Sequence, residues 1–138
     1  MDAFDADVLI YAAVRGHPWG ERVLALLPTV MEPGDAPAGI GSVLLLPELL
    51  SKPTRDGARH ELVALAALLA RLDLRPVDQA TADLAMALGA AYRLRAADAV
   101  HLATAVNSSA DRFITNNQRD FHRSIVEIDI TYPEDLAT

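Results

Sequence analysis

The sequence contains no cysteine and a single lysine, Lys52, among its 138 residues. Without thiols the chain can form no disulfide, no thiolate metal site and no cysteine nucleophile, which leaves carboxylates and the four histidines as metal ligands. Carboxylate oxygens favour hard cations such as Mg²⁺ or Mn²⁺. Because the chain lacks cysteine, its acidic residues are the main candidates for a metal site.

Long apolar runs are also missing. The longest uninterrupted one covers residues 62–70, far short of the roughly 20 residues that cross a membrane. No basic and apolar signal segment opens the sequence, so we expect a cytoplasmic protein that makes no membrane contact. The length, with 51% hydrophobic residues, predicts a single domain over residues 1–138.

Positive charge is scarce, because 12 basic residues face 19 acidic ones and the formal net charge is −7. This balance argues against a protein that coats nucleic acid through many phosphate contacts. A nuclease is still compatible with it, since a bound cation changes the local sign of an acidic cluster and arginines can contact phosphate.

Short segments that fit strands alternate with segments that fit helices. We expect strands at residues 3–4, 38–41, 72–77, 112–115 and 124–130. Helices are expected from Val8 to the break at residues 16–18, over 19–27, over 43–52 with Ser42 as cap and Pro53 as stop, and over 55–72, 78–92 and 95–106, with a last turn at Pro133. Residues 28–39 fit a loop.

This alternation predicts an α/β fold, a three-layer α/β/α sandwich with a short central parallel sheet. Ligands of such sheets bind outside the carboxyl ends of the strands. Asp5 follows the first expected strand, and Thr115 ends a later one that leads into residues 116–120. We therefore expect these residues at one edge of the sheet.

Asp5 and Asp7 flank one alanine just ahead of an apolar run. One interpretation is helix capping, for which Asp is a favoured residue. The other is that Asp5 points from the end of a strand into a shared acidic site, while Asp7 starts the helix. The rest of the chain has to decide between them.

Glu48 and Asp98 each interrupt an otherwise apolar helical segment. Glu48 fits an exposed pair with Lys52, four residues on. Asp98 fits a narrow solvent-facing stripe, formed with Arg95, His101 and Thr104. A site that collects Asp5, Glu48 and Asp98 instead explains three acids in apolar surroundings at once.

Carboxylates gathered in one site repel each other. At a separation near 4 Å and an effective dielectric near 20, two of them repel by roughly 4 kcal/mol, whereas a helix N-terminus returns about 0.3 to 1 kcal/mol. A shared proton or a divalent cation must therefore offset the rest of the repulsion between the carboxylates. His101 forms a D-x-x-H pair with Asp98, but no second histidine stands at metal-ligand spacing, so zinc is not expected.

Four stretches together resemble the PIN-domain nuclease family, and within it the VapC-like toxin ribonucleases of toxin–antitoxin pairs. They are FDADVLIYA at 4–12, SVLLLPELLSK at 42–52, RAADAVHLATA at 95–105 and FITNNQRDF at 113–121. They stand in the order of the family and cover nearly the whole chain.

The resemblance implies a Mg²⁺ or Mn²⁺ site that cleaves RNA, with Asp5, Glu48 and Asp98 as catalytic and metal-binding residues. The family pattern has a fourth acid two residues after a Thr like Thr115. This chain has Asn117 there, and its next carboxylate is Asp120. We expect Asn117 to be a neutral metal ligand, and Asp120 to replace part of the missing charge as a ligand and catalytic residue.

Other residues of the four stretches would support the site. Asp7 and His101 would assist the ligands, and Ser42, Thr115 and Asn116 would hydrogen-bond the phosphate of the substrate. The resemblance also leads us to expect RNA as substrate, a small antitoxin protein as partner, and a homodimer.

Two alternatives stay open. Asn117 favours a PIN-like binding module with weakened catalysis. The FDADV stretch also resembles the D-x-D opening of haloacid-dehalogenase phosphatases, but that chemistry, like that of a phospho-receiver domain, needs a lysine beside the acidic site, and Lys52 is the single candidate.

Overall fold

Five short strands form one parallel sheet in the computed structural model, which describes residues 1–29 and 32–137. The order across the sheet is β3-β2-β1-β4-β5, and every neighbouring pair is parallel. The strands are β1 (Asp2–Phe4), β2 (Gly39–Ser42), β3 (Leu72–Arg75), β4 (Arg112–Ile114) and β5 (Asp129–Thr131). Non-consecutive neighbours such as β1 and β4 require crossover connections, which the helices supply.

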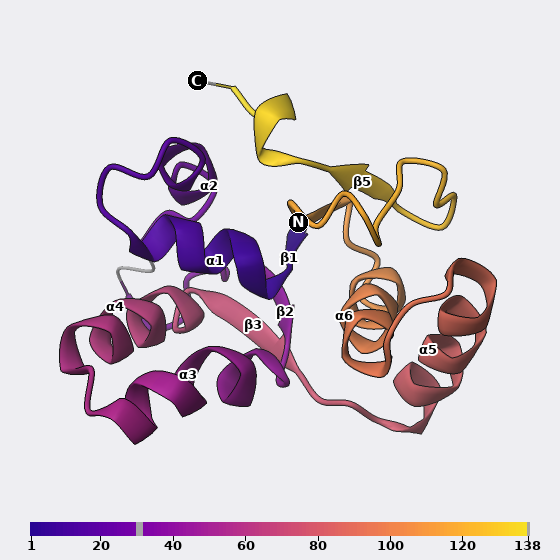
Figure 1. The fold of residues 1–138 in the computed structure, drawn as a ribbon, viewed down its shortest axis with the longest axis horizontal. Helices are drawn as coiled ribbons and strands as arrows, with labels where there is room; N and C mark the ends of the chain where they lie inside the picture. The colour runs from indigo at the N-terminus through magenta and orange to yellow at the C-terminus, as the bar shows by residue number, and fades with distance from the viewer. Residues whose placement is uncertain (30–31, 138) are drawn as a thin grey trace.

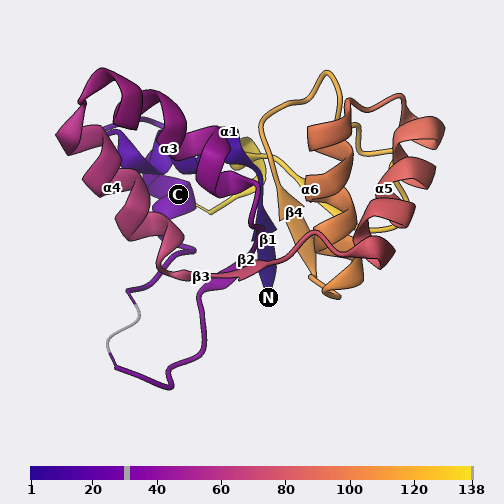
Figure 2. The same ribbon diagram turned by 90° about the horizontal axis from the view of Figure 1, so that it is seen from below.

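Helices cover both sides of the sheet (Figures 1 and 2). One side carries α1 (Ala6–Ala13), α2 (Gly20–Leu24), α3 (Leu45–Asp56) and α4 (Arg59–Leu69), and the other carries α5 (Gln79–Tyr92) and α6 (Ala96–Asn107). This is the predicted α/β/α sandwich. Among the described residues, no helix is long and apolar enough to span a membrane.

Successive strand residues point to opposite sides of the sheet, so each strand feeds two hydrophobic clusters. Phe4 and Ile114 pack into the cluster on the α1–α4 side, whereas Ala3 and Phe113 pack into the cluster on the α5–α6 side. Gly39 of β2 is needed for close packing, because a Cβ there would lie 2.5 Å from Phe4 Cε2. Both faces of β1 and β4 are thus buried, which holds their carboxyl ends in place.

The start and end of α3 differ from the prediction. Ser42 is not its cap, since it is the last residue of β2 and its Oγ accepts a hydrogen bond from Leu44 N at 3.1 Å, one residue before the helix begins. Pro53 does not stop the helix either. It lies in the last turn of α3, where its missing N–H costs the helix only one hydrogen bond. The helix ends instead at Gly57, which adopts a left-handed conformation with φ of 65°.

The last strand is shorter than predicted. β5 begins at Asp129, and residues 124–128 are irregular rather than a strand. Ile125 and Ile128 are buried from this irregular segment, so their apolar character reflects packing and not strand pairing. The predicted turn at Pro133 is confirmed as the 3₁₀ helix η1 (Pro133–Asp135). Of the expected loop over 28–39, residues 30 and 31 lie outside the described residues.

Candidate functional site

The carboxyl ends of β1 and β4 bring Asp5 and Thr115 together. Phe4 and Ile114 are paired in register, and each of the two polar residues follows directly. Thr115 Oγ1 donates a hydrogen bond to Asp5 Oδ2 at 2.8 Å, and Asp5 N donates to Ile114 O at 2.9 Å. The two polar side chains are buried, so the edge predicted from the sequence is a rigid one.

Asp5 is both a helix cap and a buried carboxylate. It is the N-cap residue of α1, and its Oδ1 accepts a hydrogen bond from Ala6 N at 2.8 Å, while the residue is only 5% exposed. Burial raises the pKa of Asp5; the charge of His101 opposes this increase and the charge of Glu48 adds to it. The two interpretations of this residue are therefore compatible.

Asp7 lies in the first turn of α1 and fastens the loop that follows β4. Its Oδ1 accepts from Val8 N at 2.7 Å, and its Oδ2 accepts from Asn116 N at 3.0 Å. Burial raises the pKa of Asp7 to about 7, and repulsion from Asp5 and Asp98 contributes to the shift. Because Asp5 is the N-cap of α1, Asp7 does not cap the helix but binds the backbone N–H groups of Val8 and Asn116.

Glu48 of α3 faces His101 of α6 across the edge of the sheet. His101 Nε2 lies 2.9 Å from Glu48 Oε1, and the histidine is 2% exposed. Its Nδ1 has no hydrogen-bond partner within the described part of the chain. Glu48 therefore pairs with His101 and not with Lys52, so of the two interpretations of Glu48 the exposed i, i+4 pair is wrong.

Asp98 is half-buried in the first turn of α6. The expected solvent-facing stripe is wrong, because His101 and Thr104 are buried. Burial is the largest cause that raises the pKa of Asp98, followed by repulsion from three other carboxylates, namely Asp5, Asp120 and Glu48. Acids from four separate segments of the chain thus share one electrostatic neighbourhood.

The loop over residues 116–121 adds Asn117 and Asp120 to this neighbourhood. Asn117 Nδ2 donates to Asp120 Oδ2 at 3.0 Å, and Asp120 N donates to Asn117 Oδ1 at 3.3 Å. Asn117 N in turn donates to Thr115 Oγ1 at 3.1 Å. Asn117, the neutral residue where the sequence predicts a fourth acid, therefore links Asp120 to the buried pair of Thr115 and Asp5.

The remaining predicted residues lie around this core. Ser42 is buried at the end of β2, next to β1 in the sheet. The Asn116 side chain donates from Nδ2 to Tyr11 Oη at 3.3 Å. Tyr11 was not predicted from the sequence, although it lies one helical turn after Asp7 and hence on the same face of α1.

The chemistry of these side chains fits a hard divalent cation, because the donors are carboxylate and amide oxygens. Positive charge among them would also relieve the mutual repulsion that adds to burial in raising the pKa values of Asp5, Asp7 and Asp98. The ligands are not preassembled, however: over residues 1–29 and 32–137, no group of three acids or histidines is arranged to hold one ion. Cation binding therefore requires side chains to turn toward one another.

This chain is similar to one protein family and to several solved structures. The family model described as PIN domain matches residues 3–124, a range that contains every residue discussed in this section. A comparison with curated protein sequences found no match.

Several solved structures share the fold. A chain of a toxin–antitoxin complex from Klebsiella pneumoniae aligns with a TM-score of 0.75 at 23% identity, covering 96% of this chain and 98% of that one. A chain of VapBC2 from Rickettsia felis, bound to a DNA fragment from its promoter, gives 0.70 at 16% identity, with 95% and 97% covered. A chain of FitAB bound to an IR36 DNA fragment gives 0.66 at 20% identity, with 100% and 99% covered.

Proposed function

Because this chain belongs to the PIN-domain family, we propose that it is a metal-dependent endoribonuclease that hydrolyses phosphodiester bonds of single-stranded RNA. One arrangement carries the proposal: Asp98 lies near Asp5, Glu48 and Asp120 from three other segments of the chain, and burial together with these carboxylates raises its pKa. Folding gains nothing from collecting like charges, so their convergence is best explained by a positively charged ligand.

In this proposal Asp5, Glu48 and Asp98 hold Mg²⁺ or Mn²⁺, and Asn117 and Asp120 complete the site. When bound, such a cation lowers the pKa of a water molecule and shields the charge that develops on the phosphate during hydrolysis. No covalent intermediate with the protein is needed.

The neighbouring side chains keep these carboxylates in place. Thr115 holds Asp5 through one hydrogen bond, and His101 holds Glu48 through another, in the way that residues behind metal ligands usually orient them. Asp7 fixes the backbone of Asn116. Ser42 and the amide of Asn116 lie at the same edge and are proposed to bind substrate phosphate.

The biological context that we propose is the toxin of a toxin–antitoxin pair, acting as a homodimer and inhibited by a small antitoxin protein. The likeness to chains of a toxin–antitoxin complex and of VapBC2 supports this context. The test is whether a small DNA-binding protein is encoded immediately upstream and co-purifies with this chain. A gene that stands alone would point to a general nuclease.

A second candidate function is a PIN-like module that binds RNA without cleaving it. The neutral Asn117 and the lack of a preassembled three-ligand group among the described residues favour it. Binding of single-stranded RNA with no Mn²⁺-dependent cleavage would support this module and contradict the nuclease.

The nuclease is tested with Asp98→Asn, which removes a charge with little change in shape. Cleavage of single-stranded RNA with Mn²⁺ should fall by about 100-fold or more, since loss of a metal-binding charge removes several kcal/mol of transition-state stabilisation. Metal-free stability should be kept or raised, because the pKa of Asp98 is raised by burial and by repulsion.

Asp83→Asn is the matched control, because Asp83 is an exposed acid on α5 whose carboxylate accepts a hydrogen bond from Gln79. It should leave cleavage unchanged. A clear loss of metal-free stability in Asp98→Asn would make Asp98 a structural residue, and wild-type cleavage by Asp98→Asn would contradict the proposed site.

A further inference from the structure

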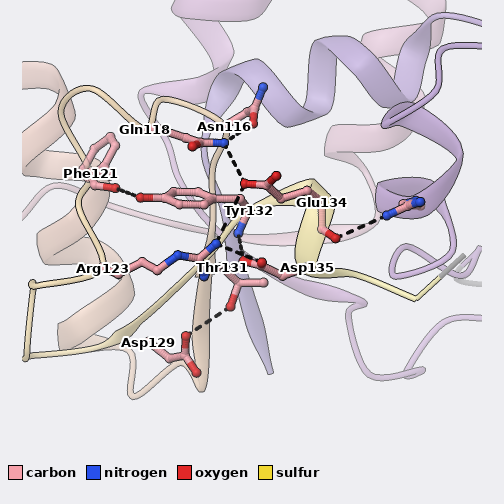
Figure 3. A network of polar contacts seen from close by, with 10 residues as sticks. Asn116, Gln118, Phe121, Arg123, Asp129, Thr131, Tyr132, Glu134 and Asp135 are labelled. Atoms are coloured by element: carbon pink, nitrogen blue, oxygen red, sulfur yellow. Dashed lines mark hydrogen bonds and ion pairs between the residues drawn. The ribbon is translucent and has the colours of Figure 1, made fainter.

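The C-terminal segment packs against the loop that carries Asn117 and Asp120 (Figure 3). Tyr132 directly follows β5 and is 4% exposed. Its hydroxyl donates a hydrogen bond to Phe121 O at 2.5 Å. The Phe121 ring is fully buried, with its centroid 5.0 Å from that of Phe113 in an edge-to-face contact. The end of the loop is thus fastened to the core and to Tyr132.

Tyr132 is itself held in one orientation. Arg123 lies over its ring, with the guanidinium carbon 4.3 Å from the ring centroid. The same guanidinium makes two hydrogen bonds to Asp135, at 2.7 and 2.8 Å, and Tyr132 N donates to Asp135 Oδ2 at 2.9 Å. A ring stacked under a doubly bonded arginine has little freedom to move its hydroxyl.

A second contact joins the same two segments. Gln118 Nε2 lies 3.2 Å from Glu134 Oε1 and 3.3 Å from Asn116 Oδ1 (Figure 3). Gln118 and Glu134 are exposed, so water competes for this contact. The buried hydroxyl of Tyr132 is therefore the stronger link.

These links matter because the loop has no helix or strand to hold it. Asn117 and Asp120 lie between two anchors, Thr115 at the start of the loop and Phe121 at its end. Phe121 N also donates to Asn117 O at 2.9 Å, so movement of Phe121 is passed on to both site residues. Errors of about 1 Å in the position of a reacting group reduce rates strongly.

We propose that the Tyr132 hydroxyl is a positioning group for the Asn117–Asp120 loop, and that it sets the distance of Asp120 from Asp98. This inference rests on the proposed nuclease function, because it assigns Tyr132 a role in that reaction. The Tyr132 hydroxyl acts through Phe121, to which it donates, and not through direct contact with Asp120 or Asp98.

The chemistry of the hydroxyl suits this role. Burial raises the pKa of Tyr132 against the opposing charge of Arg123, so the group stays protonated and able to donate near neutral pH. Tyr132→Phe removes the hydroxyl alone, keeps the ring under Arg123, and leaves a buried carbonyl of Phe121 without its donor.

The test compares wild type with Tyr132→Phe in two measurements. Amide hydrogen exchange at Asp120 and Phe121 should accelerate roughly five- to tenfold, the factor that corresponds to one net hydrogen bond. With Mn²⁺ and single-stranded RNA, kcat should fall by a similar factor, roughly five- to tenfold, while KM is unchanged, because substrate contacts are kept and the position of Asp120 is lost.

Tyr92→Phe is the matched control, because its hydroxyl contacts Glu127 and Val126 N outside the site. It should leave exchange at Asp120 and kcat as in wild type. Gln118→Ala cuts the second link and should produce the same two changes to a smaller extent, which keeps the inference testable if Tyr132→Phe does not fold.

The outcomes separate the two proposals. Wild-type exchange and wild-type kcat in Tyr132→Phe overturn the positioning role, as does a fall in kcat without faster exchange at Asp120. If wild type cleaves no RNA, the nuclease proposal fails and the positioning role in that reaction fails with it, whereas faster exchange in Tyr132→Phe would still show that the hydroxyl holds the loop.

Discussion

Asn117 Nδ2 donates a hydrogen bond to Asp120 Oδ2 at 3.0 Å. The amide thus stands where the resemblance to the family predicts a fourth acid, and it holds the next carboxylate of the chain. An aspartate at position 117 could not donate this bond. The chain therefore has a neutral residue that stabilises Asp120 where a charged one would repel it.

Restoring the charge should change stability and metal binding in opposite directions. Asn117→Asp removes the hydrogen bond and sets two carboxylates against each other, so the metal-free protein should lose about 1 to 3 kcal/mol of unfolding free energy. The affinity for Mn²⁺ and any RNA cleavage should rise. Urea unfolding, Mn²⁺ titration and cleavage assays measure the three quantities.

Asp120→Asn is the companion variant. If it abolishes Mn²⁺ binding while Asn117→Asp leaves affinity unchanged, Asp120 is the fourth ligand and the assignment of Asn117 is wrong. If neither variant alters metal binding or cleavage, the acidic edge is no catalytic site.

Divalent metal alone should stabilise the wild-type protein. A ligand that binds only the native state at 100 times its Kd adds about 2.7 kcal/mol, so millimolar Mn²⁺ or Mg²⁺ should raise Tm by several degrees. The Asp98→Asn variant should show a smaller shift. Equal shifts in both proteins would indicate metal binding elsewhere, and no shift with either ion would remove the basis for the metal site.

The stability of the metal-free protein should depend on pH through the ionisation of Asp7. Burial raises the pKa of Asp7 to about 7, above the value near 4 of an unfolded chain. Between these two pH values the native state binds more protons than the unfolded state. The protonated Asp7 therefore contributes on the order of 2 to 4 kcal/mol to the free energy of unfolding, a contribution that is complete below about pH 4 and is lost as pH rises through 7.

This effect is isolated by the difference in unfolding free energy between wild type and Asp7→Asn. As pH rises from 4 to 8, the unfolding free energy of wild type should fall relative to that of Asp7→Asn, because only wild type must ionise a buried carboxyl group. A difference that stays constant over this range would show that Asp7 titrates as an exposed acid does.

The order of the elements and the fold class followed from local patterns. Alternation of short apolar segments with helical ones is a property of neighbouring residues, so it predicted the parallel sheet and placed Asp5 and Thr115 at its carboxyl edge. The helix expected over 78–92 was equally local, and Asp78 is the N-cap of α5, with its side chain accepting from Thr81 N at 2.8 Å. Where packing outweighed local preference, as at Pro53 and residues 124–128, the prediction was wrong.

The sequence by itself thus determined which residues carry the charge and at which edge they meet. The tertiary structure alone decided their partners: Glu48 with His101 rather than Lys52, and Tyr132 with the end of the site loop. These contacts join residues separated by 53 positions in the first case and 11 in the last. The physical reason is that a hydrogen bond depends on distance in space, and only the packing of helices on both faces of the sheet brings such side chains within reach.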